Sequence, residues 1–86
     1  MKNIVKEAIS AVIDYIDEME YGESTTTRFI LGSLGYELSI DEMIEVDFEA
    51  AEEIESSRDY VMDKSAHDGL IEGLPFNLDF VKIKKV

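Results

Sequence analysis

Hydrophobic and polar positions follow two different periods along this chain, and the change comes near residue 57. Over residues 5–19 apolar side chains recur at every third or fourth position, and charged residues fill many of the positions between them. This spacing predicts an amphipathic helix, because residues three and four apart lie on the same face of a helix. Tyr21 and Gly22 mark its end.

A second, shorter helix is expected over residues 28–34. It follows the hydroxyl-rich stretch at residues 24–27, whose side chains can accept hydrogen bonds from the free N–H groups at a helix start. Gly32 interrupts the segment, and Gly35 is suited to end it.

A third helical region is predicted from Ser39, because Ser39 and Glu42 have the spacing of a capping box. The apolar face expected for this region contains Ile40, Met43, Ile44, Phe48, Ala51 and Ile54. Asp47 falls near the middle of that same face. The conflict predicts a break in which Asp47 caps a further helical segment that runs to about Ser57.

Beyond residue 57 the pattern moves towards period 2, with β-branched and aromatic residues. Short and longer strands are predicted at residues 60–62 and 77–84, and the lysines of the longer one suit an edge exposed to water. Between them, Asp68 and Gly69 form a pair typical of a tight turn.

These elements predict an α+β fold with three to four helices followed by a β-hairpin, in a single domain over residues 1–86. Residues 1–57 would form an acidic helical part and residues 58–86 a hairpin part. The order is also that of a winged helix-turn-helix, with the segment after Asp63 as the wing. Other small α+β folds share this order, so both interpretations stay open.

The chain is strongly acidic, and its net charge is unevenly distributed along the sequence. The 86 residues include 20 acids and 8 bases, which gives a net charge of −12. Fifteen acids and three bases lie in residues 1–57, whereas residues 58–86 hold five of each. Such a surface repels phosphate and anionic lipid and attracts basic protein surfaces. The absence of cysteine and of an apolar run of about 18 residues favours the cytoplasm and argues against a membrane span.

The acids are densest between Glu37 and Glu55, where nine occur without a single base. A helix that reads DNA needs lysine and arginine, so we expect no binding to duplex DNA through this region. On a helix rising about 1.5 Å per residue these acids would recur roughly every 3 Å, close to the phosphate spacing of about 3.4 Å along one DNA strand. Such a helix could occupy a basic groove built for nucleic acid, whereas the simpler interpretation is a solvated surface. The residues predicted to bind a partner are Glu42, Glu45, Glu49, Glu52 and Glu53.

No catalytic, metal or cofactor site is predicted. His67 is the only histidine, and Ser65, His67 and Asp68 lie too close in sequence to resemble a catalytic triad. The segment from Asp63 begins like a calcium loop, but Asp68 stands where the loop needs glycine, and leucine stands at its twelfth position. We therefore expect a protein that binds and is not an enzyme.

Four stretches resemble small acidic proteins of phages and mobile elements in Gram-positive bacteria: YGESTT at residues 21–26, LSIDE at 38–42, GLPFNLDF at 73–80 and KIKK at 82–85. The resemblance implies a mobile-element setting, in which acidic proteins of this size include anti-CRISPR inhibitors that block nucleic-acid grooves.

The leading hypothesis is therefore an inhibitor of a nucleic-acid-binding host protein, with a CRISPR effector among the candidate partners. One alternative is a winged-helix-like regulator or assembly factor that binds protein alone or contacts DNA weakly through Lys82, Lys84 and Lys85. Another is an accessory protein in which charge has no specific role.

Overall fold

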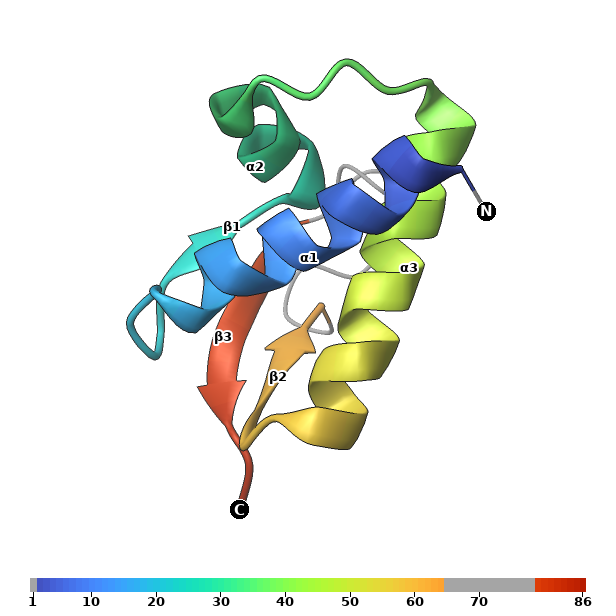
Figure 1. Ribbon diagram of the computed structural model, residues 1–86. Coiled ribbons are helices and arrows are strands. Elements are labelled where there is room, and N and C mark those ends of the chain that lie inside the picture. Colours follow the sequence, from blue (N-terminus) through green and yellow to red (C-terminus); the bar gives the residue numbers. More distant parts are fainter. Residues whose placement is uncertain (1, 65–78) are drawn as a thin grey trace.

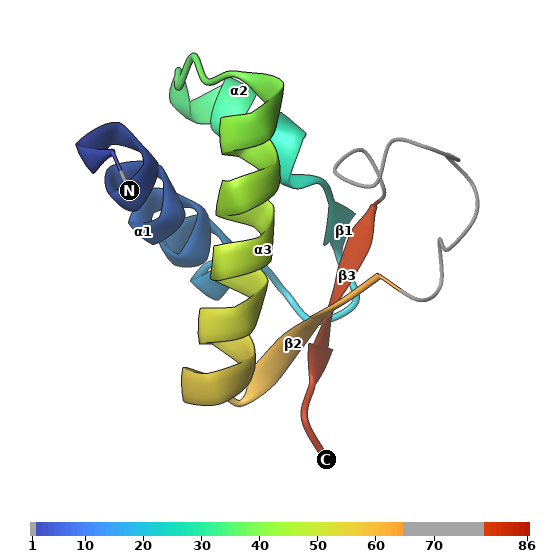
Figure 2. The same cartoon turned by 90° about the vertical axis from the view of Figure 1, so that its right-hand side faces the viewer.

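A computed structural model describes residues 2–64 and 79–86 of the chain (Figure 1). The helices are α1 (Asn3–Asp17), α2 (Thr27–Leu34) and α3 (Ile40–Ser57). The strands are β1 (Ser24–Thr25), β2 (Tyr60–Asp63) and β3 (Phe80–Lys84), and they form an antiparallel sheet in the order β1-β3-β2. Figure 2 shows the helices gathered on one side of this sheet. The prediction of an α+β fold is confirmed, and the winged helix-turn-helix stays a prediction.

Helix α1 forms as its period predicts, although it ends at Asp17 and not at the expected Tyr21 and Gly22, and it supplies much of the core. It buries one face, consisting of Val5, Ala8, Val12, Ile13 and Ile16. This face packs mainly against α3, which crosses α1 in Figure 1. Ile30 and Leu31 of α2 and Phe80 of β3 join the same cluster of buried side chains. The helices and the sheet therefore share one core.

The hydroxyl stretch before α2 caps that helix as expected. The Phe29 backbone N–H donates to the Thr26 hydroxyl over 2.9 Å, which satisfies one of the free donors of the first turn. Gly35 follows the helix with a φ of 83°, in the left-handed region that favours glycine. The sequence pattern missed β1, a two-residue strand that pairs Ser24 with Val81 and Thr25 with Phe80.

Helix α3 is continuous from Ile40 to Ser57, so the predicted break at Asp47 is wrong. The capping box is present, because Glu42 N–H donates to the Ser39 hydroxyl and Ser39 N–H donates to the Glu42 carboxylate. Asp47 lies in the middle of the helix and is buried. It caps nothing, because tertiary partners take up its side chain.

The buried face of α3 also differs from the predicted one. Its buried residues are Val46, Asp47, Ala50 and Ile54. Ile40, Ile44 and Phe48, which the sequence pattern placed in the core, are exposed instead. The helix is thus rotated about its axis relative to the prediction, and three large apolar side chains face outwards.

Strand β3 lies in the centre of the sheet, so the prediction of an edge strand exposed to water is wrong. Its pairing with β2 sets Tyr60 opposite Lys84 and Met62 opposite Lys82. Lys82 is only 5% exposed. The predicted turn at residues 68–69, the wing and the start of the predicted strand at residues 77 and 78 lie outside the described residues.

Candidate partner-binding face

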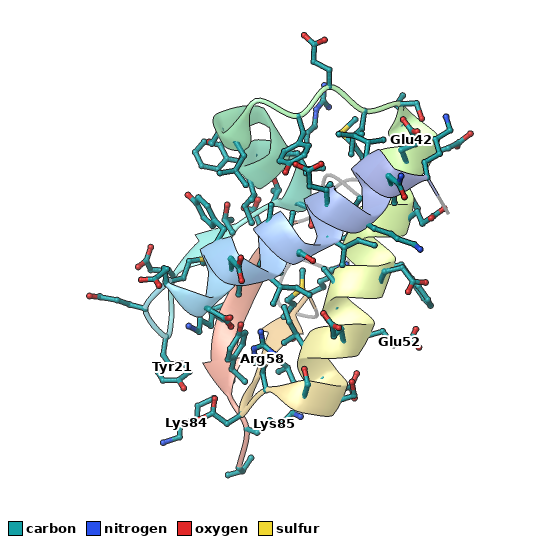
Figure 3. The ribbon with its side chains drawn as sticks, viewed as in Figure 1. Tyr21, Glu42, Glu52, Arg58, Lys84 and Lys85 are labelled. Atoms are coloured by element: carbon teal, nitrogen blue, oxygen red, sulfur yellow. The ribbon has the colours of Figure 1, made fainter. Side chains whose placement is uncertain are left out.

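The five glutamates predicted to bind a partner all lie on α3, and their positions divide them into two kinds. Glu45, Glu52 and Glu53 are exposed, whereas Glu42 and Glu49 are partly buried. Successive helix residues are about 100° apart around the axis, so these five side chains fall within an arc of roughly 100°. Figure 3 shows Glu52 pointing away from the rest of the molecule. The structure thus brings the five together on one side of α3.

Glu42 has a structural role at the start of α3. Its carboxylate accepts from the Ser39 N–H over 2.8 Å and pairs with the Lys2 ammonium at 3.1 Å. The hydrogen bond from the Ser39 backbone and the Lys2 partner lower the pKa of Glu42 below its ordinary value. Of the five glutamates, this one is the least available to a partner.

The remaining acids of this face form no ion pairs among the described residues. No ion pair within residues 2–64 and 79–86 involves Glu45, Glu49, Glu52 or Glu53. Asp41, Glu45, Glu49 and Glu53 follow one another at intervals of four along a continuous helix. Like charges at that spacing destabilise a helix by roughly 0.2–0.5 kcal/mol per pair, and a basic partner surface would relieve the repulsion.

Beside the acids runs a row of apolar side chains that we call the apolar stripe: Ile40, Ile44 and Phe48. Their exposed fractions are 58%, 38% and 63%. The sequence pattern did not reveal this surface, because it assigned these residues to the core. One signal could have revealed it, since Val46, Ala50 and Ile54 offer a second apolar row with the same spacing of four.

The buried side chain of Asp47 helps to fix which face of α3 points towards the core. Its carboxylate accepts a hydrogen bond from the Thr27 hydroxyl, at the start of α2, and pairs with Lys64, which follows β2. Thr27 is almost fully buried. These contacts tie the middle of α3 to two other elements, so that the stripe is turned to solvent.

A cluster of Arg58, Asp17 and Tyr60 lies at the C-terminal end of α3, where a basic side chain has a partner within the protein. Arg58 donates to both carboxylate oxygens of Asp17 over 3.1 Å, and the Tyr60 hydroxyl donates to the same carboxylate. The Arg58 hydrogen bond keeps the pKa of Asp17 below its ordinary value, while burial and the Asp17 carboxylate raise the pKa of Tyr60. Figure 3 shows Arg58 near Lys84 and Lys85, far from Glu42.

Lys82 belongs to this cluster and is not available to DNA. Its ammonium donates to the backbone carbonyls of Asp17 and Met19, at 3.1 and 2.6 Å, and lies 4.4 Å from the centre of the Tyr60 ring. Lys85 donates to the Glu55 carbonyl near the end of α3. Lys82 therefore cannot contribute to the alternative in which Lys82, Lys84 and Lys85 contact DNA.

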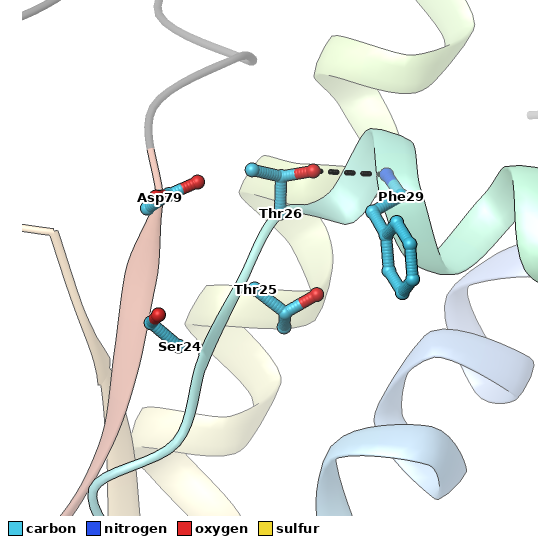
Figure 4. Close-up of a pocket in the computed structure, with 5 residues that line it drawn as sticks. All are labelled: Ser24, Thr25, Thr26, Phe29 and Asp79. Carbon is cyan, nitrogen blue, oxygen red and sulfur yellow. Dashed lines mark hydrogen bonds between the residues drawn. The ribbon is translucent and has the colours of Figure 1, made fainter.

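A shallow hollow lies on a different part of the surface, between β1, α2 and the start of β3 (Figure 4). It measures about 330 Å³ and is lined by Ser24, Thr25, Thr26, Phe29 and Asp79. The Thr25 hydroxyl is buried without a partner among the described residues, and the Thr26 hydroxyl already caps α2. Among the described residues that line the hollow there is one carboxylate and no basic side chain. These groups do not form an arrangement typical of catalysis.

The described part of the chain offers neither a cluster of metal ligands nor a membrane-spanning helix. Within residues 2–64 and 79–86, no group of three or more acidic, histidine or cysteine side chains is placed to hold a metal ion. Among the helices of these same ranges, none is long and apolar enough to cross a membrane. His67 and most of the loop that follows Asp63 fall outside the described ranges.

Comparison with known proteins adds no relative: no protein family, curated protein or solved structure matches this chain.

Proposed function

We propose that this protein inhibits a nucleic-acid-binding host protein by placing the acidic side of α3 in that protein's basic groove. The observation that carries the proposal is the composition of α3 itself. Its 18 residues contain no base, and its exposed acids lack ionic partners within the described residues. A rigid helix of this length spans about 27 Å, comparable with roughly eight phosphates along one DNA strand.

The electrostatics favour a basic protein as the partner. Bringing α3 against duplex DNA would juxtapose acids and phosphates, and only lysine and arginine contacts release the counterions that supply most DNA affinity. Acids on a fixed helix instead attract a basic surface and speed its diffusional approach. A groove already shaped for nucleic acid has the required charge, so occupation by α3 excludes the natural ligand. The setting would be that of a phage or mobile element, with a CRISPR effector among the possible targets.

A second candidate function is a winged-helix-like regulator or assembly factor. The order of elements favours it, because α2 and α3 are followed by strands β2 and β3, as in a helix-turn-helix with a wing. With an acidic α3 and a buried Lys82, this candidate would act through protein contacts rather than through DNA.

Affinity capture with two baits tests the proposal. The wild-type chain and a variant with Glu45, Glu49 and Glu52 changed to glutamine would each be immobilised and exposed to nuclease-treated lysate of a Gram-positive bacterium, at 0.05 M and 0.3 M salt. We expect the wild type to capture a nucleic-acid-binding protein at low salt and the variant to capture at least tenfold less. Added DNA or RNA should release the captured protein.

The variant also serves as a folding control. Glu45 and Glu52 are exposed and Glu49 is only partly buried, so the substitutions should leave the fold intact and relieve like-charge repulsion. Its melting temperature should equal or exceed that of the wild type. Equal capture by both baits at every salt concentration would refute the proposal and leave the acids as a solvated surface.

A further inference from the structure

The apolar stripe leaves three large side chains in water along one line of α3. Ile40, Ile44 and Phe48 are spaced by four, so the row extends over about 12 Å of helix and turns only slowly around it. Single exposed apolar residues are ordinary on protein surfaces, whereas contiguous apolar patches with polar rims mark interaction sites. Phe48 is 63% exposed, more than any other isoleucine, leucine or phenylalanine among the described residues.

Acidic residues border the stripe along its length. From the helix geometry, Asp41 and Glu45 follow the stripe on one flank, and Glu52 continues its spacing of four beyond Phe48. Glu55 lies about two turns beyond Phe48 at nearly the same angle. Neither the stripe nor this border includes a basic side chain. The surface is therefore apolar along its axis and negative along one flank and beyond Phe48.

We propose that the apolar stripe is the centre of the partner interface and that its occupant is a basic amphipathic helix of the partner protein. Such a helix would set a row of apolar side chains against Ile40, Ile44 and Phe48 and its lysines or arginines against the acidic border. Helices that bind in grooves usually present anchors at positions i, i+3, i+4 and i+7, and the spacing of four between neighbours in the stripe belongs to this pattern. The inference rests on the proposed function and adds to it a defined contact area and partner element.

Charge complementarity selects this occupant over the other candidates. A second copy of the chain would bring an equally acidic rim against the first, at a net charge of −12 on each copy. An anionic lipid surface would meet the same repulsion. A helix with an apolar face and basic flanks matches both parts of the surface, because the apolar row excludes water and the flanks neutralise the acids.

A peptide titration tests the inference even while the natural partner is unidentified. The probe is a synthetic 18-residue helix with leucine on one face and lysine on the flanks, and the control peptide replaces every leucine by glutamine while it keeps the lysines. Binding would be measured by calorimetry and by amide chemical shifts of the full chain at 0.05 M and 0.5 M salt. We expect the leucine peptide to bind at least tenfold more tightly than the control peptide, with shifts centred on the stripe.

Matched variants assign the binding to the stripe. Ile44→Ser with Phe48→Ser should weaken the leucine peptide at least tenfold at both salt concentrations. Phe29→Ser is the control, because Phe29 is 60% exposed but lies on α2 and is not part of the stripe. This variant should bind like the wild type. Circular dichroism should show all three chains equally helical, since the substituted side chains are exposed.

The other possible outcomes distinguish the proposal for the acidic side of α3 from the proposal for the apolar stripe. Equal binding of both peptides, unaffected by the stripe substitutions, overturns the stripe and leaves the acidic proposal standing. Stripe-dependent binding that changes neither with salt nor with the glutamine triple variant shows that the acids do not contribute, and it overturns the basic helix as the occupant of the stripe. Absence of any binding overturns the stripe as the docking surface. Two further results would assign the stripe to another occupant and overturn the inference. One is self-association in sedimentation experiments that Phe48→Ser abolishes. The other is a set of nuclear Overhauser contacts between Phe48 and residues 65–78 in the free chain.

Discussion

Replacing Asp47 by alanine removes a buried carboxylate from the middle of α3 and leaves its partners behind. Thr27 is only 1% exposed, and its hydroxyl would lose its acceptor, while the Lys64 ammonium would lose its counter-ion. Because Thr27 is enclosed by the core, water cannot readily replace the missing acceptor. The variant therefore tests whether Asp47 really joins α3 to α2 and β2.

The magnitude follows from these contacts. Losing a hydrogen bond to a charged acceptor and leaving a buried hydroxyl unsatisfied destabilises a fold by about 2–4 kcal/mol. The Lys64 side chain is 31% exposed and can return to water, so its pair adds only about 0–1 kcal/mol. Alanine gains roughly 0.5 kcal/mol in helix propensity over aspartate. The net expectation is about 2–4 kcal/mol, or a fall in melting temperature of roughly 8–30 °C for a domain of this size.

Urea unfolding of Asp47→Ala, Thr27→Val and the double variant would measure both the loss and the coupling. We expect a coupling energy of at least about 1 kcal/mol between the two sites, because valine removes the hydroxyl that Asp47 accepts from. If Asp47 only capped a second helix, its loss would amount to about 1 kcal/mol and would not depend on Thr27. A destabilisation below about 1 kcal/mol with no coupling would refute the structural reasoning.

The remaining predictions concern charge and burial. The chain should not bind duplex DNA below micromolar concentrations in a fluorescence anisotropy titration at 0.1 M salt, and sub-micromolar binding would overturn the charge reasoning. Lys82→Met should destabilise the fold by about 2–4 kcal/mol, since two backbone carbonyls lose a charged donor, and a urea titration showing no loss would contradict this. The lowered pKa of Asp17 means that its ionised form stabilises the fold above the unfolded pKa of about 3.9, an effect lost as pH falls through the folded pKa. The stability difference between wild type and Asp17→Asn should therefore shrink between about pH 6 and pH 2, and a difference independent of pH would contradict the assignment.

Local patterns predicted the parts of this fold whose determinants are close in sequence. Helix α1 formed where the period of 3.6 placed it, and the Ser39 capping box starts α3 as expected. The Thr26 hydroxyl caps α2 in the predicted stretch. Each of these features depends on residues within one or two helical turns.

The errors arose where distant residues decide the outcome. Asp47 looked like a helix breaker because its partners, Thr27 and Lys64, lie 20 and 17 residues away. The predicted apolar face of α3 combined Ile40, Ile44 and Phe48 with Ile54, and only Ile54 of these four is buried. The structure buries the row that contains Val46 and Ala50, because these smaller side chains allow a close approach to α1.

The sheet was only partly predictable for the same reason. Strand β1 has two residues and no apolar alternation, so its pairing with β3 leaves no local signal. Lys82 looked like a solvent-facing residue of an edge strand. It lies instead on the central strand, and its ammonium donates hydrogen bonds to backbone carbonyls at and just after the end of α1. For the candidate site, sequence located the acidic side of α3 but assigned the neighbouring apolar stripe to the core.

Competition for a captured partner tests the central claim, that the exposed side of α3 replaces nucleic acid in a basic groove. A fluorescent DNA or RNA bound to the captured protein would be titrated with the wild-type chain and with the Glu45, Glu49 and Glu52 to glutamine variant. We expect the wild type to displace the nucleic acid completely and the variant to need at least tenfold higher concentration at low salt. A stable ternary complex, in which the wild-type chain and the nucleic acid bind the partner together, would contradict it.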